Sequence, residues 1–125
     1  MSKNSIKPIL NQKFSYKISG RLWIECNGEG FFGPGRVELL QGIEKTGSIN
    51  QAAKEMGMSY KKAWEMINAL NAQAGKALVV TQAGGEKGGG SVITKEAKQL
   101  ISYHQKLRER FIAFLKKETE NLNAF

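Results

Sequence analysis

The spacing of hydrophobic positions changes along the chain, from strand-like at the start to helix-like later. Between residues 14 and 32 apolar and polar residues alternate, the period of two expected of strands. Asn27-Gly28 interrupts the alternation and favours a two-residue hairpin turn, because both turn positions need positive φ. This pattern predicts a β-hairpin with strands near Ile18–Cys26 and Glu29–Phe32.

Apolar residues then recur every three or four positions, which predicts three successive helices. The first begins at Pro34, where a missing N–H costs nothing, and ends at Gly47. The second runs from about Ile49 to Met56, and the third runs from Tyr60 to about Ala74 with Gly75 as its C-terminal stop. This part of the chain is therefore predicted to be helical apart from two short corners.

The corner between the second and third helices indicates a function. Ser48 can accept a hydrogen bond from the Gln51 amide while the Gln51 side chain reaches back, which is a capping box. Gly57 ends the second helix, and Ser59 caps the third. Two helices joined by a tight Gly-containing corner are a helix-turn-helix unit, which reads double-stranded DNA.

Two short strands and a long helix complete the predicted fold. Leu78–Thr81 and Ser91–Thr94 read as strands on either side of a glycine-rich loop, residues 83–90. Three helices, a strand, a loop and a strand are the order of a winged helix-turn-helix, with the loop as the wing. From Lys95 one long helix runs to about Asn121. The fold class is thus mainly α with small β: a winged helix-turn-helix with an N-terminal β-hairpin and a long C-terminal helix.

With 125 residues the chain is long enough for one domain and too short for two comfortable ones. We expect a flexible N-terminal arm over residues 1–13 and a winged helix-turn-helix domain over residues 14–125. The expected parts of that domain are the hairpin at 14–33, the helix-turn-helix and wing at 34–94, and a dimerisation helix at 95–122.

A seam of apolar residues follows the C-terminal helix in alternating steps of three and four, the spacing used when helices pair. The seam covers few heptads, and Ile101, Ile112 and Leu115 broaden it, so part of the helix could instead cover its own domain. The pattern favours a homodimer formed through this seam, which consists of Ala97, Leu100, His104, Leu107, Phe111 and Phe114.

A helical projection of the third helix separates a core side from a polar side. A recognition helix enters the major groove by its N-terminal end, where Lys61, Lys62 and Glu65 lie on the polar side. Glu65 could read a cytosine amino group or pair with a neighbouring lysine, and the Tyr60 ring could lie in the core with its hydroxyl on a phosphate. The pattern predicts DNA contacts by Ser48, Asn50, Gln51, Tyr60, Lys61, Lys62, Glu65 and, at the wing tip, Lys87.

Composition supports a polyanionic partner and disfavours catalysis. The formal net charge is +8 at pH 7. One cysteine and one histidine leave little material for a disulfide, a zinc site or acid–base chemistry, so the sequence predicts no enzyme, no metal and no cofactor. No apolar run approaches the roughly 18 residues of a membrane span, and the start is not a signal peptide, so a cytoplasmic protein is expected.

The run from Gly47 to Trp64, together with the glycine-rich stretch Gly84–Ser91 and Thr94, resembles the N-terminal DNA-binding domain of ModE-type, molybdate-responsive regulators. The most specific part is the Ser-Tyr-Lys-x-Ala-Trp motif at residues 59–64 combined with the Lys-Gly-Gly-Gly wing. The resemblance covers roughly Gly33 to Leu115, and a more distant one connects the chain to LysR-type DNA-binding domains.

The ModE resemblance implies a winged-helix homodimer on a palindromic operator, joined through the long C-terminal helix. ModE-type regulators also carry C-terminal oxyanion-binding modules, which this sequence is expected to lack, so molybdate sensing is not carried over. A small-molecule effector within the chain is accordingly not expected. By matching positions, the resemblance places Ser59, Tyr60, Lys61 and Lys62 in the groove and Lys87-Gly88 at the wing tip.

The leading hypothesis is a transcriptional regulator that binds duplex DNA sequence-specifically, with residues 60–74 in the major groove and the wing near the backbone or minor groove. Two alternatives stay open. One is a non-specific architectural DNA-binding protein, which would share the positive charge. The other is a binding module that responds to an oxyanion such as molybdate or tungstate.

Overall fold

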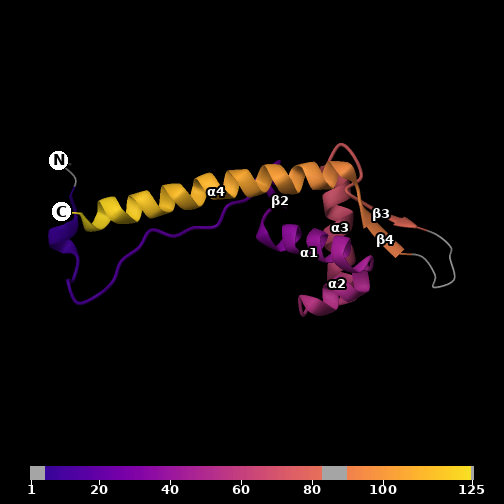
Figure 1. The fold of residues 1–125 in the computed structure, drawn as a ribbon, viewed down its shortest axis with the longest axis horizontal. Coiled ribbons are helices and arrows are strands. Elements are labelled where there is room, and N and C mark those ends of the chain that lie inside the picture. The colour runs from indigo at the N-terminus through magenta and orange to yellow at the C-terminus, as the bar shows by residue number, and fades with distance from the viewer. Residues whose placement is uncertain (1–4, 83–89, 125) are drawn as a thin grey trace. The chain divides into compact units, whose positions relative to one another are not determined.

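The computed structural model describes residues 5–82 and 90–124, which divide into two units. Unit 1 combines Met1–Leu22 with Gln105–Phe125, and unit 2 is Trp23–His104. Helix α4 (Lys95–Asn123) begins in unit 2 and ends in unit 1 (Figure 1). The predicted class, mainly α with small β, is confirmed.

Unit 2 opens with the predicted hairpin, formed by β1 (Ile24–Cys26) and β2 (Glu29–Phe32). Asn27 and Gly28 make the turn with φ of 54° and 82°, as the dipeptide predicts. The first strand is shorter than the alternation predicts, because it begins at Ile24 and not near Ile18. The Ile18 amide is used elsewhere, since it donates to the Thr119 hydroxyl at 2.8 Å within unit 1.

Three helices follow: α1 (Pro34–Thr46), α2 (Ile49–Glu55) and α3 (Tyr60–Gln73). The predicted start of α1 at Pro34 and its end at Gly47 are confirmed, with Gly47 in the left-handed region at φ 71°. Helices α1 and α2 approach so closely that a Cβ on Gly42 would lie 3.0 Å from the Ala52 Cβ. The core of unit 2 lies between these helices and includes Phe32, Leu39, Leu40, Ile43, Ala52, Ala53, Ala63, Ile67 and Leu70.

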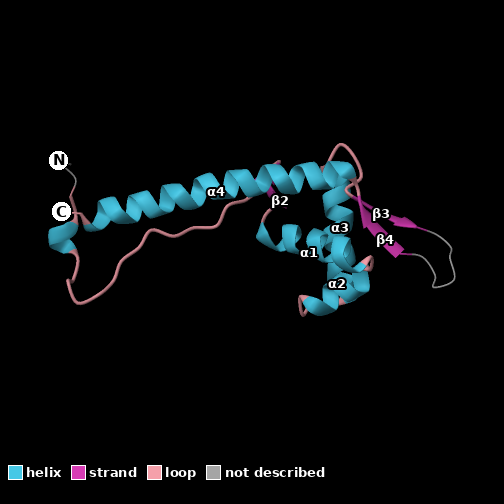
Figure 2. Ribbon diagram, viewed as in Figure 1, coloured by secondary structure: helices cyan, strands magenta, loops and turns pink. Residues whose placement is uncertain are grey.

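The wing strands β3 (Val79–Gln82) and β4 (Gly90–Ile93) pair antiparallel and are drawn in magenta beyond α3 in Figure 2. The end of α3 differs from the prediction that Gly75 stops it, because Ala74 already leaves the helix in an extended conformation, ψ 151°. The Asn71 side chain holds β3 against this end. Its Oδ1 accepts from the Leu78 and Val79 amides at 2.8 and 3.2 Å, and its Nδ2 donates to the Val79 carbonyl at 3.1 Å.

Arg36 connects the hairpin to the C-terminal end of α3. Its Nη1 donates to the Phe31 carbonyl at 2.6 Å and to Gln73 Oε1 at 2.8 Å, and Gln73 donates onward to the Gly30 carbonyl. Partial burial lowers the pKa of the Arg36 guanidinium by desolvation, although arginine stays protonated at neutral pH. The hairpin is therefore fixed to α3 by charge-assisted hydrogen bonds.

In unit 1 the N-terminal segment follows the C-terminal half of α4. A short 3-10 turn (Lys7–Ile9) is followed by extended chain, in which the Tyr16 carbonyl accepts from Asn123 Nδ2 at 3.3 Å. The Phe111 ring packs 3.2 Å from the position of a Cβ on Gly20. None of the described residues of unit 1 is fully buried. Among the described helices of both units, none has the length and apolar character to cross a membrane.

Replacing Asn71 by alanine removes three hydrogen bonds between α3 and the wing and leaves a partly buried amide unpaired. We expect Asn71→Ala to lower the free energy of unfolding by about 2 kcal/mol. Asn68→Ala on the exposed side of the same helix is the control and should change it by less than about 0.5 kcal/mol. Equal denaturation midpoints for the two variants would contradict this role of Asn71.

Candidate nucleic-acid interface

Helix α2 begins at a Ser cap, of which half of the predicted capping box is present. Ser48 Oγ accepts from the Gln51 amide at 3.0 Å, as predicted. The prediction of a reciprocal hydrogen bond with the Gln51 side chain is wrong, because the Ser48 amide donates instead to Thr46 Oγ1 at 3.2 Å. Gln51 and Asn50 are therefore exposed at the start of α2.

The corner into α3 has the geometry that its sequence predicts. Gly57 adopts φ 69°, a left-handed conformation that favours glycine, and the Met58 amide donates to the Ala53 carbonyl at 3.0 Å. Ser59 Oγ then accepts from the Lys62 amide at 3.0 Å and caps α3. The helix-turn-helix is confirmed.

Helix α3 has one buried face and one exposed face. Ala63, Ile67 and Leu70 are buried in the core. On the other face Lys61, Lys62 and Glu65 are exposed in the first two turns. No ion pair among the described residues involves these three side chains, so the alternative of a Glu65–lysine pair is not seen. Their charged groups are available to a partner.

Tyr60 and Trp64 lie one turn apart on α3 and pack edge to face, with ring centroids 6.1 Å apart. Tyr60 is 50% exposed, so the expectation that its ring belongs to the core is wrong. Trp64 is partly buried and packs against the core, the structural role that its position indicates. The pair forms one wall of a surface cavity.

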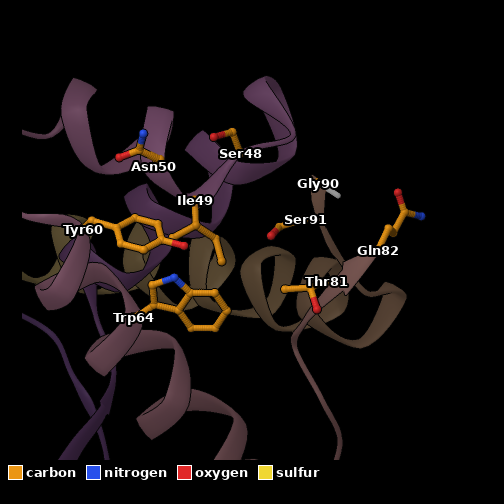
Figure 3. Close-up of a pocket in the computed structure, with 9 residues that line it drawn as sticks. All are labelled: Ser48, Ile49, Asn50, Tyr60, Trp64, Thr81, Gln82, Gly90 and Ser91. Atoms are coloured by element: carbon orange, nitrogen blue, oxygen red, sulfur yellow. The ribbon is translucent and has the colours of Figure 1, made fainter. Parts of the chain in front are cut away.

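This cavity lies between α2, α3 and the wing strands and has a volume of about 280 Å³. Figure 3 shows its walls, and we call it the α3–wing groove. No described side chain that lines it is charged. The lining residues are Ser48, Ile49, Asn50, Tyr60, Trp64, Thr81, Gln82, Gly90 and Ser91.

Sequence reasoning missed the wing side of this groove. Thr81 and Ser91 are cross-strand partners in the β3–β4 ladder and line the groove together. The signal was present in the sequence, because hydroxyl residues stand two positions from the buried Val79 and Ile93 and so share their face of the sheet. The predicted wing-tip residues Lys87 and Gly88 lie outside the described residues.

The predicted dimerisation seam occupies two different environments. Ala97 and His104 are buried in unit 2, and His104 contacts Phe32 edge to face at 5.4 Å between ring centroids. Neither residue therefore has exposed surface to offer a partner, and Leu100 packs beside them. In unit 1 Leu107 and Phe111 are partly exposed and Phe114 is exposed. The seam residues of α4 that are exposed therefore lie in its C-terminal half.

Residues 35–98 match the family described as bacterial regulatory helix-turn-helix protein, LysR family. The molybdenum transport protein ModE of Azotobacter vinelandii is 40% identical over 88 residues, which are 70% of this chain and 33% of that protein. The DNA-binding transcriptional dual regulator ModE of Escherichia coli (strain K12) is 42% identical over 79 residues, 63% of this chain and 30% of that protein.

The molybdenum-pterin-binding protein MopB of Rhodobacter capsulatus is 37% identical over 91 residues, 73% of this chain and 34% of that protein. The chain thus spans about a third of the length of the curated relatives it matches. The resemblance to ModE-type DNA-binding domains and, more broadly, to LysR-type ones is confirmed.

The Ser59 cap predicts a stability test that separates hydrogen bonding from side-chain size. Ser59→Ala should lower the free energy of unfolding by about 1 kcal/mol, because the Lys62 amide loses its acceptor. Ser59→Asp should retain the wild-type stability, since its carboxylate accepts the same bond and is favoured at a helix N-terminus. Equally lowered melting temperatures for Ser59→Ala and Ser59→Asp would refute this interpretation.

Proposed function

We propose that this chain, which belongs to the bacterial regulatory helix-turn-helix proteins of the LysR family, regulates transcription by binding duplex DNA sequence-specifically. The observation that carries the proposal is the exposed start of α3, where Lys61, Lys62 and Glu65 are free of ion pairs with other described residues. In this role α3 enters the major groove by its N-terminal turns. The lysines neutralise phosphates or donate to guanine, and Glu65 accepts from a cytosine amino group.

The relatives support the DNA-binding role for the segment that they share with this chain. The Escherichia coli relative carries the name of a DNA-binding transcriptional regulator. The shared segment is the helix-turn-helix and its surroundings, so the proposal is confined to DNA recognition and to a non-enzymatic role. A regulator of bacterial transcription would act in the cytoplasm, where the chromosome lies.

Glu65 argues against a purely architectural DNA-binding protein. A carboxylate on a face that meets phosphates weakens non-specific electrostatic attraction and contributes only where it accepts from a base. An oxyanion-responsive module is disfavoured for the described residues because no charged side chain lines the α3–wing groove. Burying a free anion there without a cation would cost its hydration energy.

The proposed regulator acts as a homodimer joined through unit 1. In unit 1 the extended segment and the C-terminal part of α4 have no fully buried residue among those described. They gain little from packing within one chain, so a second copy supplies the missing cover. Two copies of α4 that pack antiparallel and cross at Phe114 also bring opposite charges together. In that arrangement Arg110 of one copy lies opposite Glu118 of the other, and the two Phe114 rings meet.

Salt dependence tests the DNA-binding proposal most simply. A dimer that contacts three or four phosphates per protomer should show a slope of log K against log salt of about −5 to −7. Lys61→Ala and Lys62→Ala should each weaken binding and flatten the slope by about two per dimer without changing the melting temperature. Lys76→Ala, an exposed lysine beyond the opposite end of α3, is the control. A salt-independent affinity for duplex DNA would refute the proposal.

Sedimentation equilibrium tests the dimer through Phe114. The wild-type chain should sediment as a dimer, and Phe114→Glu should shift it to monomer because it places two carboxylates against each other in an apolar contact. Lys116→Glu provides the control, because two residues further along it lies on the opposite side of the helix. Monomeric wild type, or a Phe114→Glu variant that stays dimeric, would contradict the proposed interface.

A further inference from the structure

The inner face of the wing sheet changes character along its length. Val79 and Ile93 are paired and buried at 4% and 7% exposure. Two positions further along, on the same face, the pair is Thr81 and Ser91. Ser91 is only 6% exposed, although it is polar. The apolar core thus ends at this pair, and hydroxyl-bearing residues form the wall of the α3–wing groove.

Three neutral hydrogen-bond donors converge on this groove. Figure 3 shows the hydroxyls of Ser91 and Tyr60 turned toward the space between α3 and the wing, and the indole nitrogen of Trp64 on the ring edge beside Tyr60. No hydrogen bond between described residues uses these three atoms. Ser91 is only 6% exposed, and the hydroxyl that it turns to the groove is free to donate to an acceptor that enters from outside.

The chemistry of the walls selects the class of acceptor. All three groups can donate, and none of the lining side chains within residues 5–82 and 90–124 carries a charge. A free oxyanion would enter without a compensating cation and lose its hydration. A phosphodiester of a duplex differs, because the lysines of α3 neutralise the strand to which it belongs. The volume of about 280 Å³ lies just below the usual range for small-molecule pockets and admits a protruding group.

We propose that the α3–wing groove seats one backbone phosphodiester of bound DNA, held by Ser91 Oγ, Tyr60 Oη and Trp64 Nε1. This assignment rests on the proposed DNA-binding function and adds a neutral anchor to it. The anchor is preorganised, because the Ser91 amide donates to the Gly47 carbonyl at 3.0 Å and Asn71 fixes β3 to α3. Phosphate contacts of this kind set the register of a recognition helix without reading sequence.

Three variants each remove one donor: Ser91→Ala and Tyr60→Phe nearly keep the shape of the side chain, and Trp64→Phe also shortens the ring system. Each should weaken binding about tenfold, the usual effect of losing a hydrogen bond to a charged group. The loss should be the same for every duplex sequence, and the salt slope should not change because no cation is removed. Ser102→Ala and Tyr103→Phe, exposed on α4, are matched controls that should bind like wild type.

A duplex with single methylphosphonate linkages, which are neutral, identifies the phosphate. A neutral linkage at one position should weaken wild-type binding. The same linkage should leave the affinity of the Ser91→Ala/Tyr60→Phe variant unaltered. If Trp64→Phe fails to fold, this double variant still tests the proposal. It should fold, because Tyr60 is half exposed and the Ser91 hydroxyl makes no hydrogen bond to another described residue.

Two results would overturn the groove assignment while leaving the proposed function intact. One is wild-type affinity of the three donor variants for a duplex that the wild-type chain binds. The other is a loss restricted to one base sequence, which would make the donors base readers. A wild-type chain that binds no duplex at all would instead refute the proposed function itself.

Discussion

The close packing of α2 between α1 and α3 is the constraint from which the candidate interface follows. Gly42 and Ala52 bring α1 and α2 nearly into backbone contact, and the Ala53 carbonyl accepts from Met58 to fix the corner. With α2 held so close, α3 can bury Ala63, Ile67 and Leu70 only by turning its other face to solvent. The exposure of its lysines is therefore a consequence of core packing, and a larger side chain at Ala52 would disturb both.

The wing is joined to this arrangement by the buried Val79 and Ile93 and by polar contacts. Asn71 bonds to the start of β3, and the Ser91 amide bonds to the Gly47 carbonyl at the end of α1. These bonds hold the sheet beside α3 at a distance that leaves a groove. A recognition helix and a wing that are fixed to each other can grip one strand of a duplex together, with lysines supplying affinity and neutral donors supplying register.

Local signals in the sequence predicted most of the fold. Asn27-Gly28, Pro34, Ser48, Gly57 and Ser59 each specify a backbone conformation within a few residues, and all five have the expected roles. The predictions from sequence failed where contacts between residues distant in sequence determine the local structure. Ile18 bonds to Thr119 in place of a strand neighbour, and Asn71 determines how the chain leaves α3. His104 has the spacing of a dimer seam but packs on Phe32 of its own chain, a contact that periodicity alone does not reveal.

The central claim is that the start of α3, presented by two protomers related by a two-fold axis, reads a DNA sequence. Selection of bound duplexes from a random pool tests it most directly. The account predicts one enriched motif made of two inverted half-sites, whose centres lie about 10 base pairs or a multiple of that apart. Recovery of duplexes with no common sequence would contradict it.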